Sequence, residues 1–365
     1  MVTRRGWGAV LAGAALGLGA VPVRAQPAGP AVTITEYPVP TPDSRPGGLV
    51  VGPDGALWFI ESVGNRIGRL TLGGRLTEFP IPTPAAHLPN QAFVGLGPDG
   101  MVWFTESAAN KLGRITPAGE ITEYPIPSAA AVQDPVLGEV RTSFPIAVAA
   151  GADRAVWFNE RATNQIGRLT PDGRFAEYPL PEGVGGLVGL APGPDGALWF
   201  TATTPGHVGR VAPDGAMTVH AIPTPESGVL RLKAGPDGAV WFVENQANQV
   251  GRATGDGRIV EFPVPATGVG PDIAPGPDGA MWFTVLTDNL LGRVTATGEV
   301  TLYPVPTPLS RPYWLVTGAD GALWFTEING NQLGRAQLRR APGALPRTGG
   351  PPAMASGLAL PMAEP

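Results

Sequence analysis

The segment GPDGALWF at residues 52–59 recurs in altered form along most of this chain. Its Trp-Phe pair returns seven times, at Trp58, Trp103, Trp157, Trp199, Trp241, Trp282 and Trp324. Consecutive tryptophans are 45, 54, 42, 42, 41 and 42 residues apart. Periods near 42 residues are typical of units made of four short strands. The sequence therefore predicts an all-β fold, a seven-bladed β-propeller with four antiparallel strands in each blade.

The first unit shows why four strands form. Pro53-Asp54-Gly55 supplies a turn, and the strand after it places Trp58 and Phe59 on opposite faces. A second turn follows at Asn65, and asparagine tolerates the left-handed conformation that a tight turn needs. The same slot holds Asn110, Asn164, Asn248, Asn289 and Asn331, with Gly206 in the fourth unit. The 52 glycines and 43 prolines thus mark turns and strand ends rather than disorder.

The two ends of the repeat region complement each other. Thr33 to Pro40 reads as an outer strand with no Trp-Phe pair before it, whereas the unit at Trp324 ends near Arg340 without an outer strand. We expect the N-terminal strand to complete the last blade and close the ring. The predicted propeller spans residues 26–340.

Both segments outside the propeller have a distinct composition. Residues 1–25 read as a signal peptide, because Arg4 and Arg5 precede an apolar run and Val23-Arg24-Ala25 offers small residues for cleavage. A twin-arginine export signal and a membrane anchor are the alternatives. Residues 341–365 read as a disordered Pro/Gly/Ala-rich tail, within which Leu345 to Gly349 resembles a sortase cell-wall anchoring motif. We expect an exported, periplasmic or extracellular protein with no membrane span in the mature chain.

The charge and composition of the chain limit the kinds of binding partner that we expect. The chain carries 25 basic and 30 acidic residues, a net charge of −5, and has no basic run and no cysteine. A nucleic-acid partner is not expected. We expect a monomer that takes a small or extended ligand at the mouth of its central channel, where the connections between blades converge.

Two sets of equivalent positions are candidates for the channel mouth. The first, five residues before each turn glycine, is almost wholly apolar: Gly47, Ala92, Ile146, Val188, Leu230, Pro271 and Tyr313. The second follows each Trp-Phe pair and holds five carboxylates, Glu61, Glu106, Glu160, Glu244 and Glu327, with Ala202 and Val285 in the other two units. If they faced inward, these carboxylates could bind a divalent cation. Otherwise they satisfy turn amides or pair with the arginines of the next strand.

Repeated arginines and scarce histidines have different meanings. An arginine occurs in every unit, at Arg69, Arg114, Arg168, Arg210, Arg252, Arg293 and Arg335, and so predicts a structural role in the blade. Among the three histidines, His87 is the one expected near the channel mouth, since it lies in the first connection between blades.

The units GPDGALWFIESVGNRIGRLT and GPDGMVWFTESAANKLGRIT, followed by TEFPIP and TEYPIP, resemble the repeats of the virginiamycin B lyase family. The similarity covers residues 31–338. It implies a seven-bladed fold and, for active members, magnesium-dependent opening of a streptogramin B ring by elimination, with a histidine base. Where the family has Glu-Pro-His, this chain has Arg311-Pro312-Tyr313. The preceding Pro-His slot falls at Pro271 or Asp272, and of the metal and base positions only Glu327 is matched.

These departures leave two hypotheses. Elimination needs a base with a pKa near neutrality, and tyrosine, with an unperturbed pKa near 10, is a poor one. We therefore expect a ligand-binding or scaffold protein, with Tyr313, Trp314, Arg311, Asp272 and His87 as candidate ligand-binding residues and no catalytic residue assigned. The alternative is a carbon-oxygen lyase or lactonase-type enzyme with a rearranged site, for which magnesium on Glu327 is the cofactor that the resemblance suggests.

One connection is longer than the others. Between Trp103 and Trp157 about 12 residues are added, and they fall between Ser128 and Phe144. We expect this insertion to overhang the channel mouth and to influence ligand access.

Overall fold

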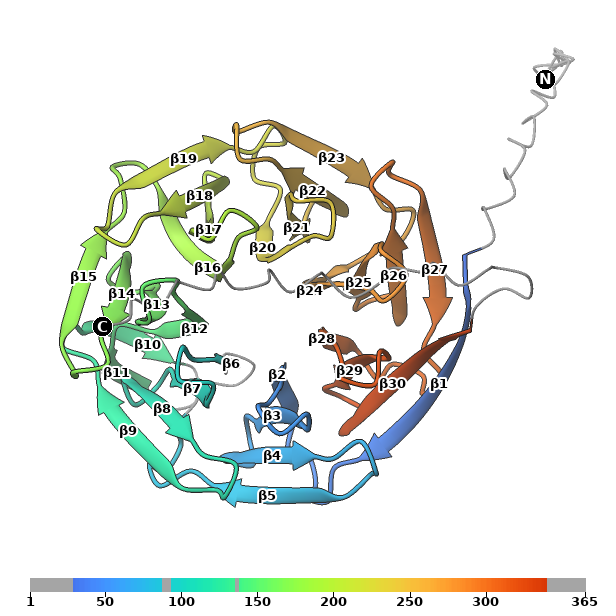
Figure 1. The fold of residues 1–365 in the computed structure, drawn as a ribbon, viewed down its shortest axis with the longest axis horizontal. Helices are drawn as coiled ribbons and strands as arrows, with labels where there is room; N and C mark the ends of the chain where they lie inside the picture. The colour runs from blue at the N-terminus through green and yellow to red at the C-terminus, as the bar shows by residue number, and fades with distance from the viewer. Residues whose placement is uncertain (1–28, 87–92, 135–137, 340–365) are drawn as a thin grey trace, which may run out of the picture.

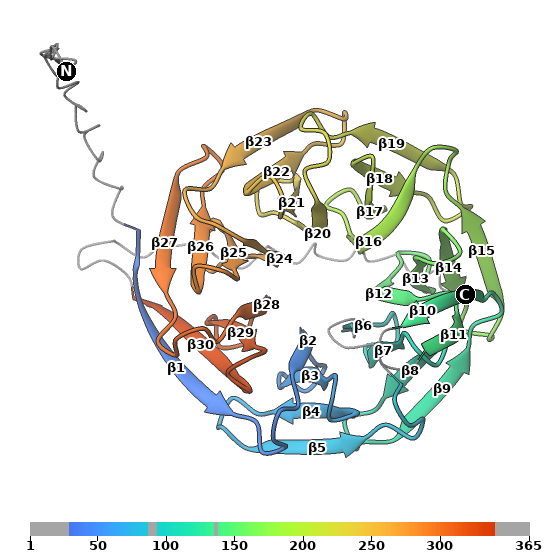
Figure 2. The ribbon, with the colours of Figure 1, turned by 180° about the vertical axis from the view of Figure 1, so that it is seen from behind.

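The computed structural model describes residues 29–86, 93–134 and 138–339, which form seven four-stranded antiparallel sheets arranged as blades around one axis (Figures 1 and 2). The innermost strands are β2 (Pro46–Val51), β6 (Val94–Leu96), β12 (Pro145–Ala150), β16 (Gly185–Pro192), β20 (Val229–Ala234), β24 (Val269–Pro275) and β28 (Pro312–Thr317). The predicted fold is confirmed.

The second and third strands lead outward from the axis. The second strands, which carry the Trp-Phe pairs, are β3 (Leu57–Glu61), β7 (Val102–Glu106), β13 (Val156–Glu160), β17 (Leu198–Thr204), β21 (Val240–Glu244), β25 (Met281–Val285) and β29 (Leu323–Glu327). The third strands are β4 (Arg66–Leu70), β8 (Lys111–Ile115), β14 (Gln165–Leu169), β18 (His207–Val211), β22 (Gln249–Ala253), β26 (Leu290–Val294) and β30 (Gln332–Arg339).

The outer strands form the rim, and the first strand of the chain is one of them. Blades 1 to 6 end in β5 (Leu76–Pro80), β9 (Ile121–Pro125), β15 (Phe175–Pro179), β19 (Met217–Ala221), β23 (Ile259–Pro263) and β27 (Val300–Pro304). Blade 7 takes β1 (Ala31–Pro38), which pairs antiparallel with β30 from Ala31–Arg339 to Pro38–Gln332. The predicted ring closure by the N-terminal strand is confirmed, and it removes two free sheet edges.

The repeated arginines hold the turn that begins each second strand. In blade 1, Asp54 accepts hydrogen bonds from the indole N–H of Trp58 and from Arg69. Equivalent arginine–aspartate pairs occur in all seven blades at 2.5–2.8 Å, beside seven buried tryptophans. The structural role predicted for the arginines is confirmed. For the strand-end glutamates, pairing with these arginines was one of the predicted alternatives. That prediction is wrong, because each arginine binds the aspartate of the Gly-Asp turn instead.

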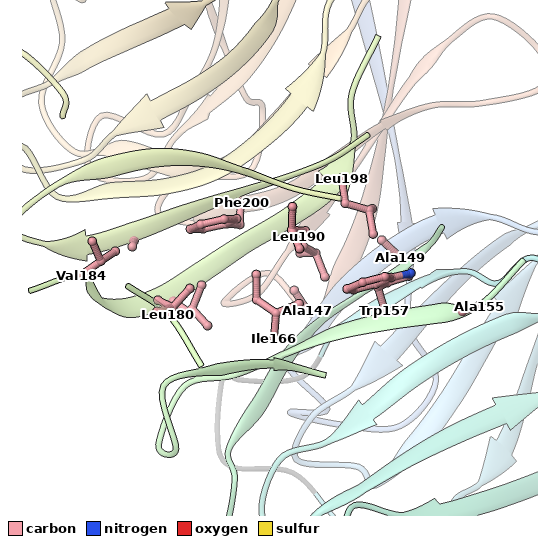
Figure 3. Close-up of a cluster of buried hydrophobic side chains, with 13 residues drawn as sticks. Ala147, Ala149, Ala155, Trp157, Ile166, Leu180, Val184, Leu190, Leu198 and Phe200 are labelled. Atoms are coloured by element: carbon pink, nitrogen blue, oxygen red, sulfur yellow. The ribbon is translucent and has the colours of Figure 1, made fainter. Parts of the chain in front are cut away.

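The core lies between blades. In Figure 3, Trp157 and Ile166 of blade 3 pack against Leu190, Leu198 and Phe200 of blade 4. Every blade can therefore bury aromatic residues on both faces, which explains why the Trp-Phe pair does not alternate with polar residues.

The two faces of the disc differ. The turn face carries the Gly-Asp turns between first and second strands, and the connection face carries the segments that run from one blade to the next. The insertion forms a hairpin on the connection face, β10 (Ala130–Asp134) and β11 (Gly138–Thr142), over the sector of blades 2 and 3 in Figures 1 and 2. Thr142 and Ser143 fix it to Asn110 of blade 2.

Several predictions concern segments outside the described residues. These are the signal peptide at 1–25, the tail at 341–365 with Leu345 to Gly349, and His87 with Ala92 in the first connection. Within the described residues, we find no helix long and apolar enough to cross a membrane.

Candidate functional site

The innermost strands leave their regular pairing where they approach the axis. The register shifts between Val229 and Leu232 in β20, between Val269 and Ile273 in β24, and between Pro312 and Leu315 in β28. The β24 bulge contains one residue more than the other two. Bulged residues are free of the ladder and can be aimed away from their own sheet, and bulges often lie beside functional sites.

Hydrogen bonds to neighbouring strands hold the residues of the blade 6 and blade 7 bulges in place. Trp314 donates its backbone N–H to the Thr326 hydroxyl at 3.2 Å, and the Tyr313 carbonyl accepts the hydroxyl of Thr284 from blade 6, also at 3.2 Å. The Asp272 carboxylate accepts the backbone N–H of Leu315 at 2.9 Å. Blades 6 and 7 are thus joined through the residues nearest the axis.

Arg231 crosses the axis. It lies on β20 of blade 5, yet its guanidinium stands 3.4 Å from the ring centre of Trp314 in blade 7 and 4.0 Å from that of Phe93 beside β6 in blade 2. Neither blade adjoins blade 5 in the ring (Figure 1). The two aromatic rings meet edge to face at 4.9 Å. Arg231 is only 7% exposed, so its guanidinium is buried between these two aromatic rings.

Two polar atoms of this cluster are buried without a hydrogen-bond partner. They are Nη2 of Arg231 and Oδ1 of Asp272, on side chains that are 7% and 1% exposed. Buried donors and acceptors are normally satisfied by protein, water or ligand, and leaving them unpaired costs free energy. The described residues alone therefore do not complete this site.

Burial also shifts the ionisation of the cluster. It lowers the pKa of Arg231 to about 9, and the negative charge of Asp272 opposes that shift. It lowers the pKa of Lys233, two residues along β20, while Asp272 opposes that shift. Burial raises the pKa of Tyr313, and the nearby Arg231 and Arg311 oppose that shift. Arg231 is therefore charged and Tyr313 is a neutral phenol at neutral pH.

The predicted site residues are partly brought together. Tyr313, Trp314 and Asp272 gather around Arg231. The Trp314 ring stacks on the guanidinium and contacts the Tyr313 ring, and Asp272 is close enough to influence the pKa of Arg231. Arg311 lies exposed where the chain enters β28, with its N–H bound to Asn289. Within the predicted apolar set, Ile146 and Val188 pack in one cluster with Trp314, which half-buried Leu230 and Tyr313 join. Whether any of these residues binds a ligand stays a prediction.

Arg231, Lys233 and Phe93 were missed, although a signal for two of them was present. The predicted apolar set lies five residues before each turn glycine. One position later the units read Gly48, Phe93, Ala147, Gly189, Arg231, Asp272 and Trp314. Three of these equivalent positions hold glycine or alanine, and the other four hold large or charged side chains. This contrast indicates that the four larger side chains fill a central space that all the blades share.

The charged neighbours of the strand-end glutamates lie on the third and outer strands of their own blades. Glu327 is fully buried, its Oε2 accepts the Gln332 amide at 3.1 Å, and its charged neighbour is Glu36 of the outer strand. Burial raises its pKa to about 7. No group of three or more His, Asp or Glu side chains within the described ranges is placed to hold a metal ion. The groups around Glu327 therefore do not fit a magnesium ion, which needs several oxygen ligands.

A family model described as the virginiamycin B lyase family matches residues 27–137 and 136–341. The chain belongs to the virginiamycin B lyase family. Against a virginiamycin B lyase of Bordetella pertussis it is 47% identical over 51 residues, which are 14% of this chain and only 17% of that relative.

Two solved structures of this family extend the likeness to the whole propeller. One is selenomethionine-substituted virginiamycin B lyase from Staphylococcus aureus, with 34% identity, a TM-score of 0.75, and coverage of 85% of this chain and all of that one. The other is a catalytically inactive histidine-to-alanine variant of the S. aureus enzyme with quinupristin, with 33% identity, the same TM-score and the same coverage. A histidine is thus essential to the activity of that relative.

Proposed function

We propose that this chain is a ligand-binding propeller that uses the family scaffold without opening a streptogramin ring. The observation that carries the proposal is the cluster of Arg231, Asp272 and Trp314, which come from three different blades. Two buried polar atoms of this cluster have no hydrogen-bond partner among the described residues. Such a convergence of polar groups beside an aromatic wall is typical of a binding site.

The chemistry at the family's base and metal positions supports binding over elimination. Tyr313 stands where the resemblance places a histidine, and its pKa is raised rather than lowered toward neutrality. Arg311 brings a positive charge where the family has a glutamate, which disfavours a bound cation. The binding surface is the connection-face mouth, with half-buried Tyr313 and Leu230 as apolar walls.

Quinupristin, with and without magnesium, tests the proposal. We expect mass spectrometry to recover it unopened, and thermal shifts with a panel of macrocyclic and small apolar esters to detect binding that Tyr313→Ala weakens. Magnesium-dependent ring opening that is lost in Glu327→Gln would instead establish the alternative, an ester-opening lyase with a rearranged site. If the folded protein neither binds nor opens any member of the panel, the proposed function is wrong.

We also propose that the protein is exported. Support comes from the sequence alone, namely Arg4-Arg5, the apolar run after them and Ala25 at the expected cleavage position. Fractionation of the source cells, with N-terminal sequencing of the mature protein, tests it. A cytoplasmic protein that keeps Met1 would contradict it.

A further inference from the structure

The junction of blades 2 and 3 departs from the repeat on the turn face, far from the proposed binding surface. In six of the seven Gly-Asp turns the last residue is a glycine with a positive φ of 71–79°. In blade 3 that position is Arg154, with a φ of 64°. A side chain is strained in this left-handed region, and such strain persists mainly where function requires it.

The packing between blades is also different there. At four other junctions, an aromatic ring on the outer strand of one blade lies against a glycine in the next blade, in the turn between its third and outer strands. A Cβ added to that glycine would lie only 2.1–2.5 Å from the ring. These pairs are Phe79–Gly119, Tyr178–Gly215, His220–Gly257 and Phe262–Gly298. At the junction of blades 2 and 3 the equivalent glycine is Gly173, and no atom lies within 4 Å of that position. Tyr124 is therefore not packed onto Gly173.

The missing contact leaves a cavity of about 340 Å³. Tyr124, Trp103, Arg114 and Arg154 line it, with apolar surface from Val156 and Leu169. Trp103 is 5% exposed, whereas the other six repeat tryptophans are at most 1% exposed. This volume is at the lower end of the range for small-molecule pockets, which is roughly 300–1,000 Å³.

The charged residues that line the cavity indicate which charge its ligand should carry. Arg114 is already paired with Asp99 at 2.5 Å, so this pair is neutral as a whole. Arg154 is exposed, and none of the ion pairs among the described residues includes it. The cavity therefore carries one uncompensated positive charge beside an aromatic wall, where Trp103 and Tyr124 stack at 5.1 Å. A guanidinium binds a carboxylate with two parallel hydrogen bonds.

We propose that this cavity is a second binding site, for a small planar aromatic carboxylate whose ring lies against Tyr124 and Trp103 and whose carboxylate is bound by Arg154. The cavity is lined by turn-face residues of blades 2 and 3, whereas the proposed binding surface lies on the connection face, and the two sets share no residue. It does not depend on the proposed function.

The test compares 2-naphthoate with 2-naphthamide, a neutral molecule of the same shape, by titration calorimetry on the full chain. We expect naphthoate to bind at least about tenfold more tightly than the amide, because only the carboxylate makes a charge-assisted pair. Arg154→Gly restores the residue that the other turns use. It should raise the melting temperature while weakening naphthoate binding by about tenfold or more.

The matched control is Arg174→Ala. Arg174 is a nearby arginine with an 82% exposed side chain that does not line the cavity, so its loss changes the net charge equally and should leave naphthoate binding unchanged. Equal affinity for naphthoate and naphthamide would overturn the carboxylate assignment, and unchanged binding in Arg154→Gly would overturn the site. Binding lost in Arg231→Met but kept in Arg154→Gly would place the ligand in the channel and also overturn it.

Discussion

Blades 4 and 6 differ from the other five blades at a pair of positions near the connection face. In the five, the glutamate that ends the second strand lies beside a glutamate of the outer strand. The pairs are Glu61–Glu78, Glu106–Glu123, Glu160–Glu177, Glu244–Glu261 and Glu327–Glu36. Blade 4 has Ala202 and Val219 at these positions, and blade 6 has Val285 and Leu302.

A third position changes together with the pair. In the five blades, the connection that enters the blade supplies a threonine or serine that donates its backbone N–H to the outer glutamate. These residues are Thr41, Thr83, Ser128, Thr224 and Thr307. The equivalent residues are Glu182 before blade 4 and Ala266 before blade 6. Since all three positions switch together, we expect their contributions to stability to be coupled.

The largest effect is expected in blade 7, whose two glutamates come from opposite ends of the chain. Deleting residues 1–40 removes Glu36 and all of β1, and exposes the edge of β30. Loss of several partly buried apolar side chains, each contributing less than the roughly 1.5–3 kcal/mol of a fully buried one, together with the exposed strand edge should lower Tm by roughly 10 °C. Differential scanning calorimetry measures this. Deleting residues 1–28, which leaves β1 whole, is the control, and an equal effect of both deletions would refute the closure model.

Breaking one pair should be worse than replacing it. In blade 5, Glu261→Leu leaves the Thr224 N–H without its acceptor and the buried Glu244 carboxyl beside an apolar side chain, at a cost of about 1–3 kcal/mol. The double variant Glu244→Val with Glu261→Leu imitates blade 6 and should cost less than the sum of the two single variants. Urea unfolding of the three proteins measures the coupling. Strict additivity would show that the pair is not a unit.

The pairs should also make stability depend on pH. Burial, and then the neighbouring carboxylate, raises the pKa of Glu61 to about 8 from 4.5, and burial does the same for Glu106, Glu160 and Glu244. Between these values the folded state keeps protons that the unfolded chain releases, so the free energy of unfolding falls as pH rises from 4.5 through about 8.

The blade 5 double variant sharpens this prediction. With one such proton removed, its slope should be shallower by up to about 1.4 kcal/mol per pH unit. Urea unfolding at several pH values between 5 and 9 compares it with the unmodified chain. Identical slopes would show that Glu244 does not hold a proton in the folded state.

The smallest effects are expected at the third position. Thr224→Ala removes the hydroxyl that binds Glu261 at 2.9 Å and should cost about 1 kcal/mol. Ala266→Thr adds a hydroxyl where no outer glutamate exists, so its effect should stay within about 0.5 kcal/mol. The same urea assay compares them, and a stabilising Ala266→Thr would show that the hydroxyl acts without the pair.

The fold could be predicted from the sequence because it depends on features that repeat. The turn asparagines Asn65, Asn110, Asn164, Asn248, Asn289 and Asn331 all have a positive φ, as their spacing indicated. The antiparallel pairing of β1 with β30 followed from counting strands. Each of these features is local or periodic, so a single chain contains enough information to find it.

The axial site depends on features that do not repeat. Arg231 stacks on Trp314 and Phe93 across the ring, and no local pattern encodes a contact between blades 5, 7 and 2. The bulges interrupt the regular alternation of the innermost strands, so the apolar set counted from the turn glycines missed the neighbouring positions that hold Arg231 and Asp272. The glutamates were correctly singled out as a set, but their partners on the outer strand were not.

Ring closure by β1 also has a consequence for biosynthesis. Ala31 leaves the ribosome long before Arg339, its partner in the finished blade. At about 5–20 residues per second, β1 waits roughly 15–60 s for the strand that completes it. During that interval its ladder groups are open to other chains, and Pro38 at its end and the charged Glu36 within it are residues of the kind that discourage such pairing. Closure of blade 7 therefore has to join the first and the last strands of the described chain.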